Sequence, residues 1–276
     1  MPDLPRTSHI KLERRGPVLH LWLDRPEVRN ALSAQMAREI LATFAAIADD
    51  RSVRVVVLRG AGGTFCAGAD LKNLAVAGEP TAAAAAGAAD ELKESNRRFG
   101  TMMETVNAAP QAVIAAVEGY AMGGGFGLAC VADITIATVD ARFAMTEVTI
   151  GVVPAAISPF VVKRIGLTAA RRFGVSGARL TGAEACAIGV AHLVVPDAAA
   201  LDAAVRDASN QILKCAPVAV AATKRLMLRA AGPTPLSELL DDAADCFAAA
   251  VRSDEGREGT KSFVEKRKPS WAVQVE

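Results

Sequence analysis

The chain is expected to fold around the glycine-rich stretch Glu118-Gly119-Tyr120-Ala121-Met122-Gly123-Gly124-Gly125-Phe126-Gly127-Leu128. The stretch follows an apolar run at 112–117 that predicts a buried strand, and it leads into a short predicted helix at 128–132. Glycines between a strand and a helix indicate a tight turn and a close approach of the backbone to a neighbouring group. The first N–H groups of a helix lack partners inside the helix and lie at the positive end of its dipole. We therefore predict that this turn can hold a negatively charged oxygen.

The length and composition limit the possible class of protein. The chain has 276 residues, enough for one large domain or for one domain with a helical appendage. The 31 basic and 30 acidic residues nearly cancel, which argues against a nucleic-acid partner. The five cysteines are widely spaced and form no CxxC pair, so we expect reduced thiols and no metal site. Charges interrupt every long apolar run, and the polar N-terminus does not resemble a signal peptide. We expect a cytoplasmic protein that does not enter a membrane.

Hydrophobic periodicity predicts alternating strands and helices in the first two thirds of the chain. Strands are expected at 20–24, 53–58, 134–139, 142–145 and 190–195, and helices at about 34–48 and 90–107, with short helices at 159–164, 169–175 and 181–188. Ser33 is the expected N-cap of the helix at 34–48. The Ala- and Gly-rich stretch 75–89 has little anchoring bulk, and we predict low order there.

From about residue 198 the pattern is purely helical, with charged faces and apolar stripes. Such stripes need a surface to cover them, either the core or another subunit. We therefore divide the chain into a core at 1–197 and a helical oligomerisation region at 198–276.

A second glycine-rich turn, at 60–71, follows the predicted strand at 53–58. At the central turn, 118–128, a P-loop is excluded because no lysine lies between Lys93 and Lys163. A dinucleotide fingerprint fails as well, because Leu128 or Cys130 stands where its third glycine belongs and the following helix is too short. Two interpretations remain. The turns serve tight packing alone, or each directs one backbone N–H at the same oxygen and together they form an oxyanion hole.

Four segments resemble the crotonase (enoyl-CoA hydratase/isomerase) superfamily, in the family's order and across nearly the whole chain. They are Asp24-Arg25-Pro26-Glu27-Val28-Arg29-Asn30-Ala31-Leu32, Phe65-Cys66-Ala67-Gly68-Ala69-Asp70-Leu71, Gly119-Tyr120-Ala121-Met122-Gly123-Gly124-Gly125 and Phe263-Val264-Glu265-Lys266-Arg267-Lys268-Pro269. The resemblance implies an α/β fold, a crotonase-like spiral of ββα turns, with a C-terminal helical region that builds trimers or dimers of trimers. It also implies an acyl-CoA substrate and no separate cofactor, because coenzyme A is part of that substrate.

The resemblance also assigns site residues. It gives the oxyanion N–H donors as Ala67 and Gly124, places Arg25 and Val28 at the nucleotide end of CoA, Ala69, Asp70 and Leu71 along its path, and Phe263 and Lys266 at the CoA of a neighbouring subunit. For Asp70 a simple role as a helix cap is the alternative.

The acid–base residues bear on the type of reaction. The best-known enoyl-CoA hydratases use two glutamates, and the resemblance places them at Glu147 and at position 127, where this chain has glycine. Glu147 stands between apolar stretches, where desolvation would raise the pKa of its carboxyl group. A solvated acid without a catalytic role is the alternative for Glu147.

Two further similarities favour hydration in spite of the missing glutamate. Residues 146–162 and the sequence Gly125-Phe126-Gly127-Leu128 are similar to a bacterial branch that hydrates branched glutaconyl-CoA esters. We expect an enoyl-CoA hydratase, with a branched or carboxylated acyl group as the finer expectation. A Δ3,Δ2-enoyl-CoA isomerase, for which one glutamate suffices, and a non-catalytic acyl-CoA-binding subunit are the alternatives.

Overall fold

The computed structural model describes residues 4–70 and 90–275. The low order predicted at 75–89 and the assignment of Leu71 to the CoA path therefore lie outside the described residues.

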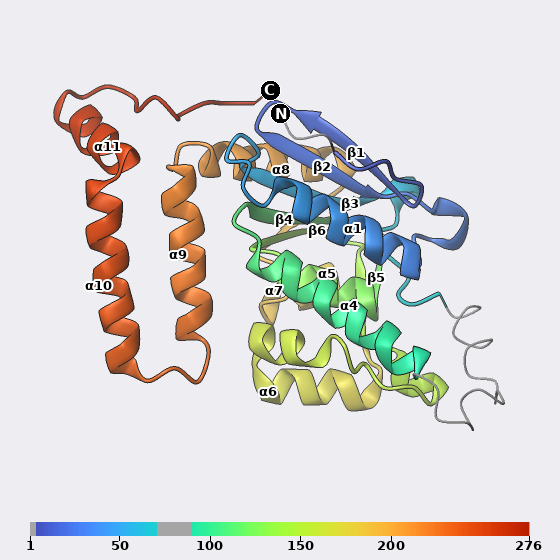
Figure 1. The fold of residues 1–276 in the computed structure, drawn as a ribbon. Helices are drawn as coiled ribbons and strands as arrows, with labels where there is room; N and C mark the ends of the chain where they lie inside the picture. The colour runs from blue at the N-terminus through green and yellow to red at the C-terminus, as the bar shows by residue number, and fades with distance from the viewer. Residues whose placement is uncertain (1–3, 71–89, 276) are drawn as a thin grey trace.

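A six-stranded sheet forms the centre of the fold (Figure 1). In spatial order its strands are β1 (Ile10–Arg15), β2 (Val18–Leu23), β3 (Val55–Gly60), β4 (Ala112–Val117), β6 (Ile134–Thr138) and β9 (Leu193–Val195). β1 is antiparallel to β2, and all other neighbouring strands are parallel. A smaller sheet contains β5 (Tyr120–Met122), β7 (Arg142–Ala144) and β8 (Arg179–Thr181). The central glycine-rich stretch connects the two sheets, since β4 belongs to one and β5 to the other.

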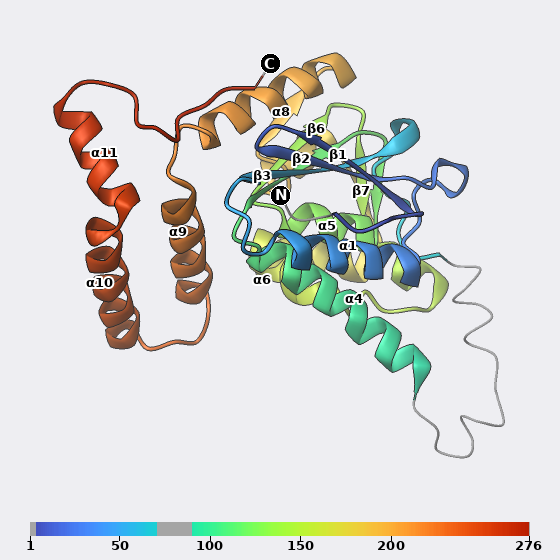
Figure 2. The ribbon, with the colours of Figure 1, turned by 45° about the horizontal axis from the view of Figure 1, so that its top comes forward.

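Helices cover both faces of the large sheet (Figure 2). On one face α8 (Ala198–Ile212) packs Leu201 and Val205 against Val55 and Val57 of β3. On the other face lie α1 (Ala34–Ile47), α4 (Glu91–Ala108) and α5 (Gly124–Val131). All six residues of β3 are consequently buried, and the strand predicted at 53–58 is found two residues later, at 55–60.

The long helix α6, the short helix α7 and three 3-10 turns complete the core. α6 (Ser158–Ser176) and α7 (Gly182–Ala187) lie close to the smaller sheet, and the 3-10 turns are η1 (Pro26–Val28), η2 (Ala61–Gly63) and η3 (Glu147–Ile150). The two helices predicted at 159–164 and 169–175 form the single element α6, which is kinked at Gly166. Ser33 is confirmed as the N-cap of α1, because its side chain accepts the N–H of Met36.

The helix after the central glycines begins at Gly124, four residues before the predicted start at 128. Close packing explains the difference. A Cβ on Gly124 would lie 2.5 Å from Leu32 Cδ1, and one on Gly125 would lie 2.6 Å from Cys66 Cβ. The first turn of α5 therefore needs glycine, although glycine is a weak helix former.

Three C-terminal helices, α9 (Pro217–Ala230), α10 (Leu236–Arg252) and α11 (Asp254–Val264), form an arm beside the core (Figures 1 and 2). Lys224 of α9 fastens the arm to the core through Asp133, with Nζ and Oδ2 2.7 Å apart. No residue of α9 or α10 is buried within this chain. Among the described residues, no helix is both long enough and apolar enough to cross a membrane.

Candidate active site

The central glycine turn leaves one main-chain donor without a partner. Gly123 has a φ of +49°, and its N–H donates to Ala144 O at 2.8 Å. Gly124 is the first residue of α5, and its N–H meets no acceptor among the described residues. The Gly124 N–H lies at the positive end of the α5 dipole. It is available to a negatively charged oxygen, and its role as an oxyanion donor stays a prediction.

The second glycine turn presents a different amide from the one predicted. The N–H of Ala67 donates to Arg29 O at 2.9 Å and is therefore already used inside the fold. The assignment of Ala67 as an oxyanion donor is wrong for this reason. Two residues later, the N–H of Ala69 has no acceptor in the described part of the chain.

The pairing of residues 66–70 fixes the direction in which the Ala69 amide points. Cys66 bridges Ala121 of β5 on one edge, and Ala69 bridges Leu32 on the other. Leu32 donates to Gly68 O at 2.7 Å and accepts the N–H of Asp70 at 3.1 Å. In extended backbone the groups of the residue between those two point to the opposite edge. The Ala69 N–H therefore faces the edge where β5 continues into Gly123 and Gly124.

Contact between the two turns is close. Gly68 has a φ of +99°, and a Cβ there would lie 3.0 Å from Met122 O and 3.7 Å from Gly123 Cα. Only glycine adopts this conformation without strain, and only glycine leaves room for the neighbouring strand. The two unpartnered amides, of Ala69 and Gly124, thus come from segments that touch.

The carboxyl group of Glu147 lies against the same turn. Glu147 opens η3 just after β7, and its Oε1 is 2.8 Å from the position that a Cβ on Gly123 would occupy. Its Oε2 is buried and has no hydrogen-bond partner among the described residues. Desolvation by burial raises the pKa of this carboxyl group. The structure therefore places a partly desolvated acid against Gly123, the residue before Gly124, and the desolvated environment is the one that the sequence predicted.

The position of a second glutamate is closed. A Cβ on Gly127 would overlap Ile157 Cγ2 and would lie 2.9 Å from Ile157 Cβ and 3.3 Å from Met103 Cε. Ile157 and Met103 are both almost fully buried. Packing from α4 and from the start of α6 thus fills the space that a side chain at position 127 would need.

The family model described as enoyl-CoA hydratase/isomerase matches residues 13–274 of this chain. The chain belongs to this family. A carnitinyl-CoA dehydratase of Proteus mirabilis is 35% identical over 271 residues, which cover 96% of this chain and 98% of that protein. Among solved structures, Pseudomonas aeruginosa AtuE is 49% identical, with a TM-score of 0.90 over 96% of this chain and all of that chain. An enoyl-CoA hydratase/isomerase from Marinobacter aquaeolei is 47% identical, with a TM-score of 0.90 over 96% of this chain and 99% of that one. The crotonase α/β fold predicted from the resemblance is confirmed.

The residues that the resemblance assigns to the nucleotide end and to the path of CoA lie close together. Arg25 pairs with Asp70, with Nη2 and Oδ2 3.1 Å apart, and its Nη1 donates to Ala31 O at 2.8 Å. Val28 closes η1 and is half-buried. Ala69 lies next to Asp70 and is exposed. The contact of these residues with CoA stays a prediction.

A cleft runs from the Ala69 turn to the first half of α4. Its lining includes Leu32, Ala69 and Asp70 on one side and Leu92, Arg98 and Phe99 on the other. Arg98 is half-buried, and no ion pair joins it to another residue in the described ranges, whereas its neighbour Arg97 pairs with Glu104. No sequence pattern pointed to Arg98, because its position depends on the packing of α4.

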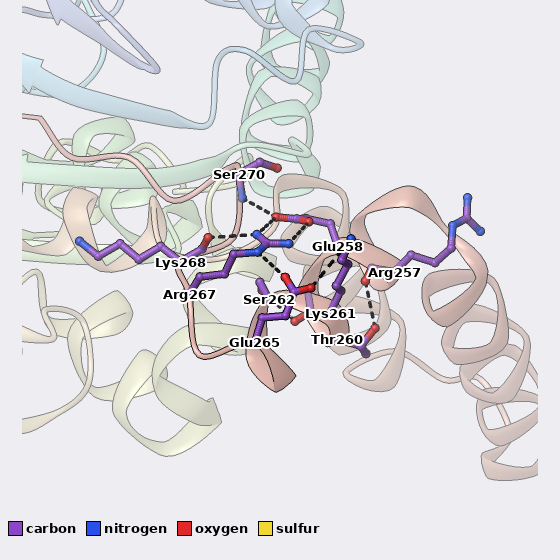
Figure 3. Close-up of polar contacts among 10 residues, drawn as sticks. Arg257, Glu258, Thr260, Lys261, Ser262, Glu265, Arg267, Lys268 and Ser270 are labelled. Atoms are coloured by element: carbon purple, nitrogen blue, oxygen red, sulfur yellow. Dashed lines mark hydrogen bonds and ion pairs between the residues drawn. The ribbon is translucent and has the colours of Figure 1, made fainter.

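Phe263 belongs to α11 and Lys266 follows it, and α11 lies in the arm, away from α1, α4 and α5 of the same chain (Figure 1). The end of α11 is held by Arg267, which binds both oxygens of Glu258 at 2.6 and 2.8 Å and Glu265 at 2.7 Å (Figure 3). This cluster lowers the pKa of Glu258 to about 2, chiefly through the hydrogen bond from Arg267. Phe263 is left 85% exposed. A single chain does not bring these two residues to the site, and their contact with a neighbouring subunit's CoA stays a prediction.

Proposed function

We propose that this protein is an enoyl-CoA hydratase that adds water across the 2,3 double bond of an acyl-CoA thioester. The observation that carries the proposal is the position of the Glu147 carboxyl group, partly desolvated and in contact with the glycine turn that exposes the Gly124 amide. An acid beside a pair of free amides suits a reaction in which a proton moves while negative charge grows on a carbonyl oxygen.

In this mechanism the thioester oxygen accepts hydrogen bonds from the N–H groups of Ala69 and Gly124. Glu147 takes a proton from water as the water oxygen bonds to the β-carbon, and negative charge develops on the thioester oxygen. Glu147 then returns a proton to the α-carbon on the same face, because it is the one acid beside the turn in the described residues. The raised pKa of Glu147 suits this double role, since the group must both accept and donate a proton.

Replacement of Glu147 by Gln tests the assignment. The substitution keeps the shape of the side chain and removes its proton-transfer ability, so we expect kcat to fall by about 10²-fold or more. Affinity for an unreactive acyl-CoA, measured by calorimetry, should stay within about threefold of the unchanged protein, because the substitution keeps the shape of the side chain. A threefold change in affinity corresponds to less than about 1 kcal/mol of binding free energy. A protein that shows no turnover before the substitution, and binds acyl-CoA equally well afterwards, would be a binding subunit.

An isomerase that moves the double bond from position 3 to position 2 is the second candidate. The closure of position 127 by Ile157 and Met103 favours it, because this reaction needs a single acid. The two reactions differ in the fate of solvent oxygen. In H₂¹⁸O a hydratase places the heavy oxygen on the β-carbon of the product, and an isomerase incorporates none. Mass spectrometry of the product decides between them.

For the acyl group we propose a carboxylate-bearing chain. Arg98 supports this, because it is half-buried in the cleft beside Ala69, whereas Glu91 and Glu94 at the same cleft are exposed. Replacing Arg98 by Gln should lower kcat/KM for glutaconyl-CoA about tenfold or more and leave that for crotonyl-CoA nearly unchanged. A preference for a cationic acyl group, such as the carnitinyl group in the name of the Proteus relative, would contradict the proposal.

We also propose that the chain works as a trimer or as a dimer of trimers, in which the arm of one subunit brings Phe263 and Lys266 to the CoA of the next. The exposed apolar side chains of α10 and α11 support this assembly, since isolated soluble helices rarely expose such stripes.

A further inference from the structure

We propose that Asn30 is a positioning residue that aims the Ala69 amide into the oxyanion hole. This inference rests on the proposed function. Asn30 is fully buried, with 0% of its surface exposed, and its φ of +56° lies in the left-handed region that asparagine tolerates better than most residues. Among the described residues, its side chain forms no hydrogen bond with Glu147 or Gly124. Its effect on the reaction must therefore pass through other groups.

The Asn30 side chain joins two loops. Its Oδ1 accepts the N–H of Arg25 at 2.9 Å, while its Nδ2 donates to Ala61 O at 2.8 Å and to Thr64 O at 2.6 Å. The first contact closes the loop that carries Arg25, together with the bond from Asn30 N to Arg25 O at 2.9 Å. The other two contacts hold the glycine turn that follows β3. A side chain with both hydrogen-bond donors and an acceptor used in the interior fixes the distance between these loops.

Residues next to Asn30 in the sequence connect its position to that of the Ala69 amide. Arg29 O accepts the N–H of Ala67 at 2.9 Å, and Leu32 binds both Gly68 O and Asp70 N. These three bonds attach the segment 67–70 to the segment 29–32 on one side of Ala69. The Ala69 N–H is left pointing to the opposite side, at Gly123 and Gly124. Asn30 therefore determines where the loop with Leu32 stands, and Leu32 determines where the Ala69 amide points.

Misplacement of the amide should act on the transition state more than on binding. Loss of one oxyanion donor lowers kcat by about 10²–10³-fold, and a displacement of about 1 Å lowers it by about 10²-fold. We expect Asn30→Gly, which keeps the positive φ accessible, to lower kcat by about 10- to 100-fold and to change KM much less.

A spectroscopic probe separates positioning from general support of the fold. A conjugated aryl-enoyl-CoA, 4-(dimethylamino)cinnamoyl-CoA, absorbs at longer wavelength when hydrogen bonds polarise its thioester carbonyl. The unchanged protein and Glu147→Gln should bind it with a red shift. Asn30→Gly should bind it with a clearly smaller shift. Asn210→Ala is the matched control. The Asn210 side chain also uses its amide group to bind backbone, since it accepts the N–H of Val275 and donates to Val275 O, but it takes no part in the loops of the site. This variant should show the full shift.

The second variant is Asn30→Asp, which keeps the size of the side chain and the acceptor for Arg25 N. It replaces the amide that donates to two carbonyl oxygens by a carboxylate that repels them. Its probe shift should be small at pH 8 and should grow as the pH falls, because a protonated carboxyl group can donate to one of these oxygens.

Three results separate the possibilities. A full red shift in Asn30→Gly would overturn the proposal for Asn30. Loss of folded protein in both Asn30 variants, judged by circular dichroism and elution volume, would also overturn it, because Asn30 would then support the whole core. A red shift absent already from the unchanged protein would instead contradict the proposed function, since no polarising pair of amides would exist.

Discussion

The Glu147 carboxyl group occupies a place that suits its neutral form. Burial raises its pKa, so the folded chain binds this proton more tightly than the unfolded chain. The group therefore adds stability at low pH that is lost as the pH rises through the folded-state pKa. Replacement by Gln removes the charge, so Glu147→Gln should melt at a higher temperature than the unchanged protein at pH 8, by about 2 °C. The difference should shrink toward pH 4. Melting curves across this range check the prediction, and an equal melting temperature at every pH would show that Oε2 is solvated.

At the scale of elements, α5 and its neighbours explain why position 127 of this chain carries no acid. The space beside Gly127 belongs to Ile157 and Met103, from α4 and the start of α6. Introducing Glu there should overpack the core at a cost of about 1–3 kcal/mol and should not raise hydratase turnover. Shortening the obstacle, in Gly127→Glu with Ile157→Ala, should recover part of the stability that Gly127→Glu loses. Urea unfolding and kcat of the unchanged protein and of the two variants check this. A stable, more active Gly127→Glu protein would show that the position is open.

The same elements show what the sequence could predict. The apolar run of β3, the Ser33 cap and the desolvated setting of Glu147 depend on local pattern, and all were predicted correctly. The assignment of the oxyanion donor to the Ala67 amide was wrong, because the free amide of this segment is the one that faces away from Leu32 and Arg29. That direction is set by pairing with Leu32, more than thirty residues earlier. The early start of α5 and the filling of position 127 likewise depend on contacts with residues distant in sequence.

At the scale of the whole molecule, the arm presents an exposed apolar surface. Four apolar side chains of α10 recur on one helix face and are largely exposed: Leu236, Leu240, Phe247 and Val251, at 70%, 60%, 72% and 48%. If this face joins subunits, Leu240→Lys with Phe247→Lys should lower the mass in sedimentation to that of one chain. Glu238→Lys, on the opposite face of α10, is the matched control and should stay assembled. The separated chains should also bind acyl-CoA about tenfold or more weakly, because Phe263 and Lys266 would no longer reach a neighbour's site. Full assembly of the double variant would place the subunit contact elsewhere, whereas separation without loss of affinity would remove Phe263 and Lys266 from the CoA site.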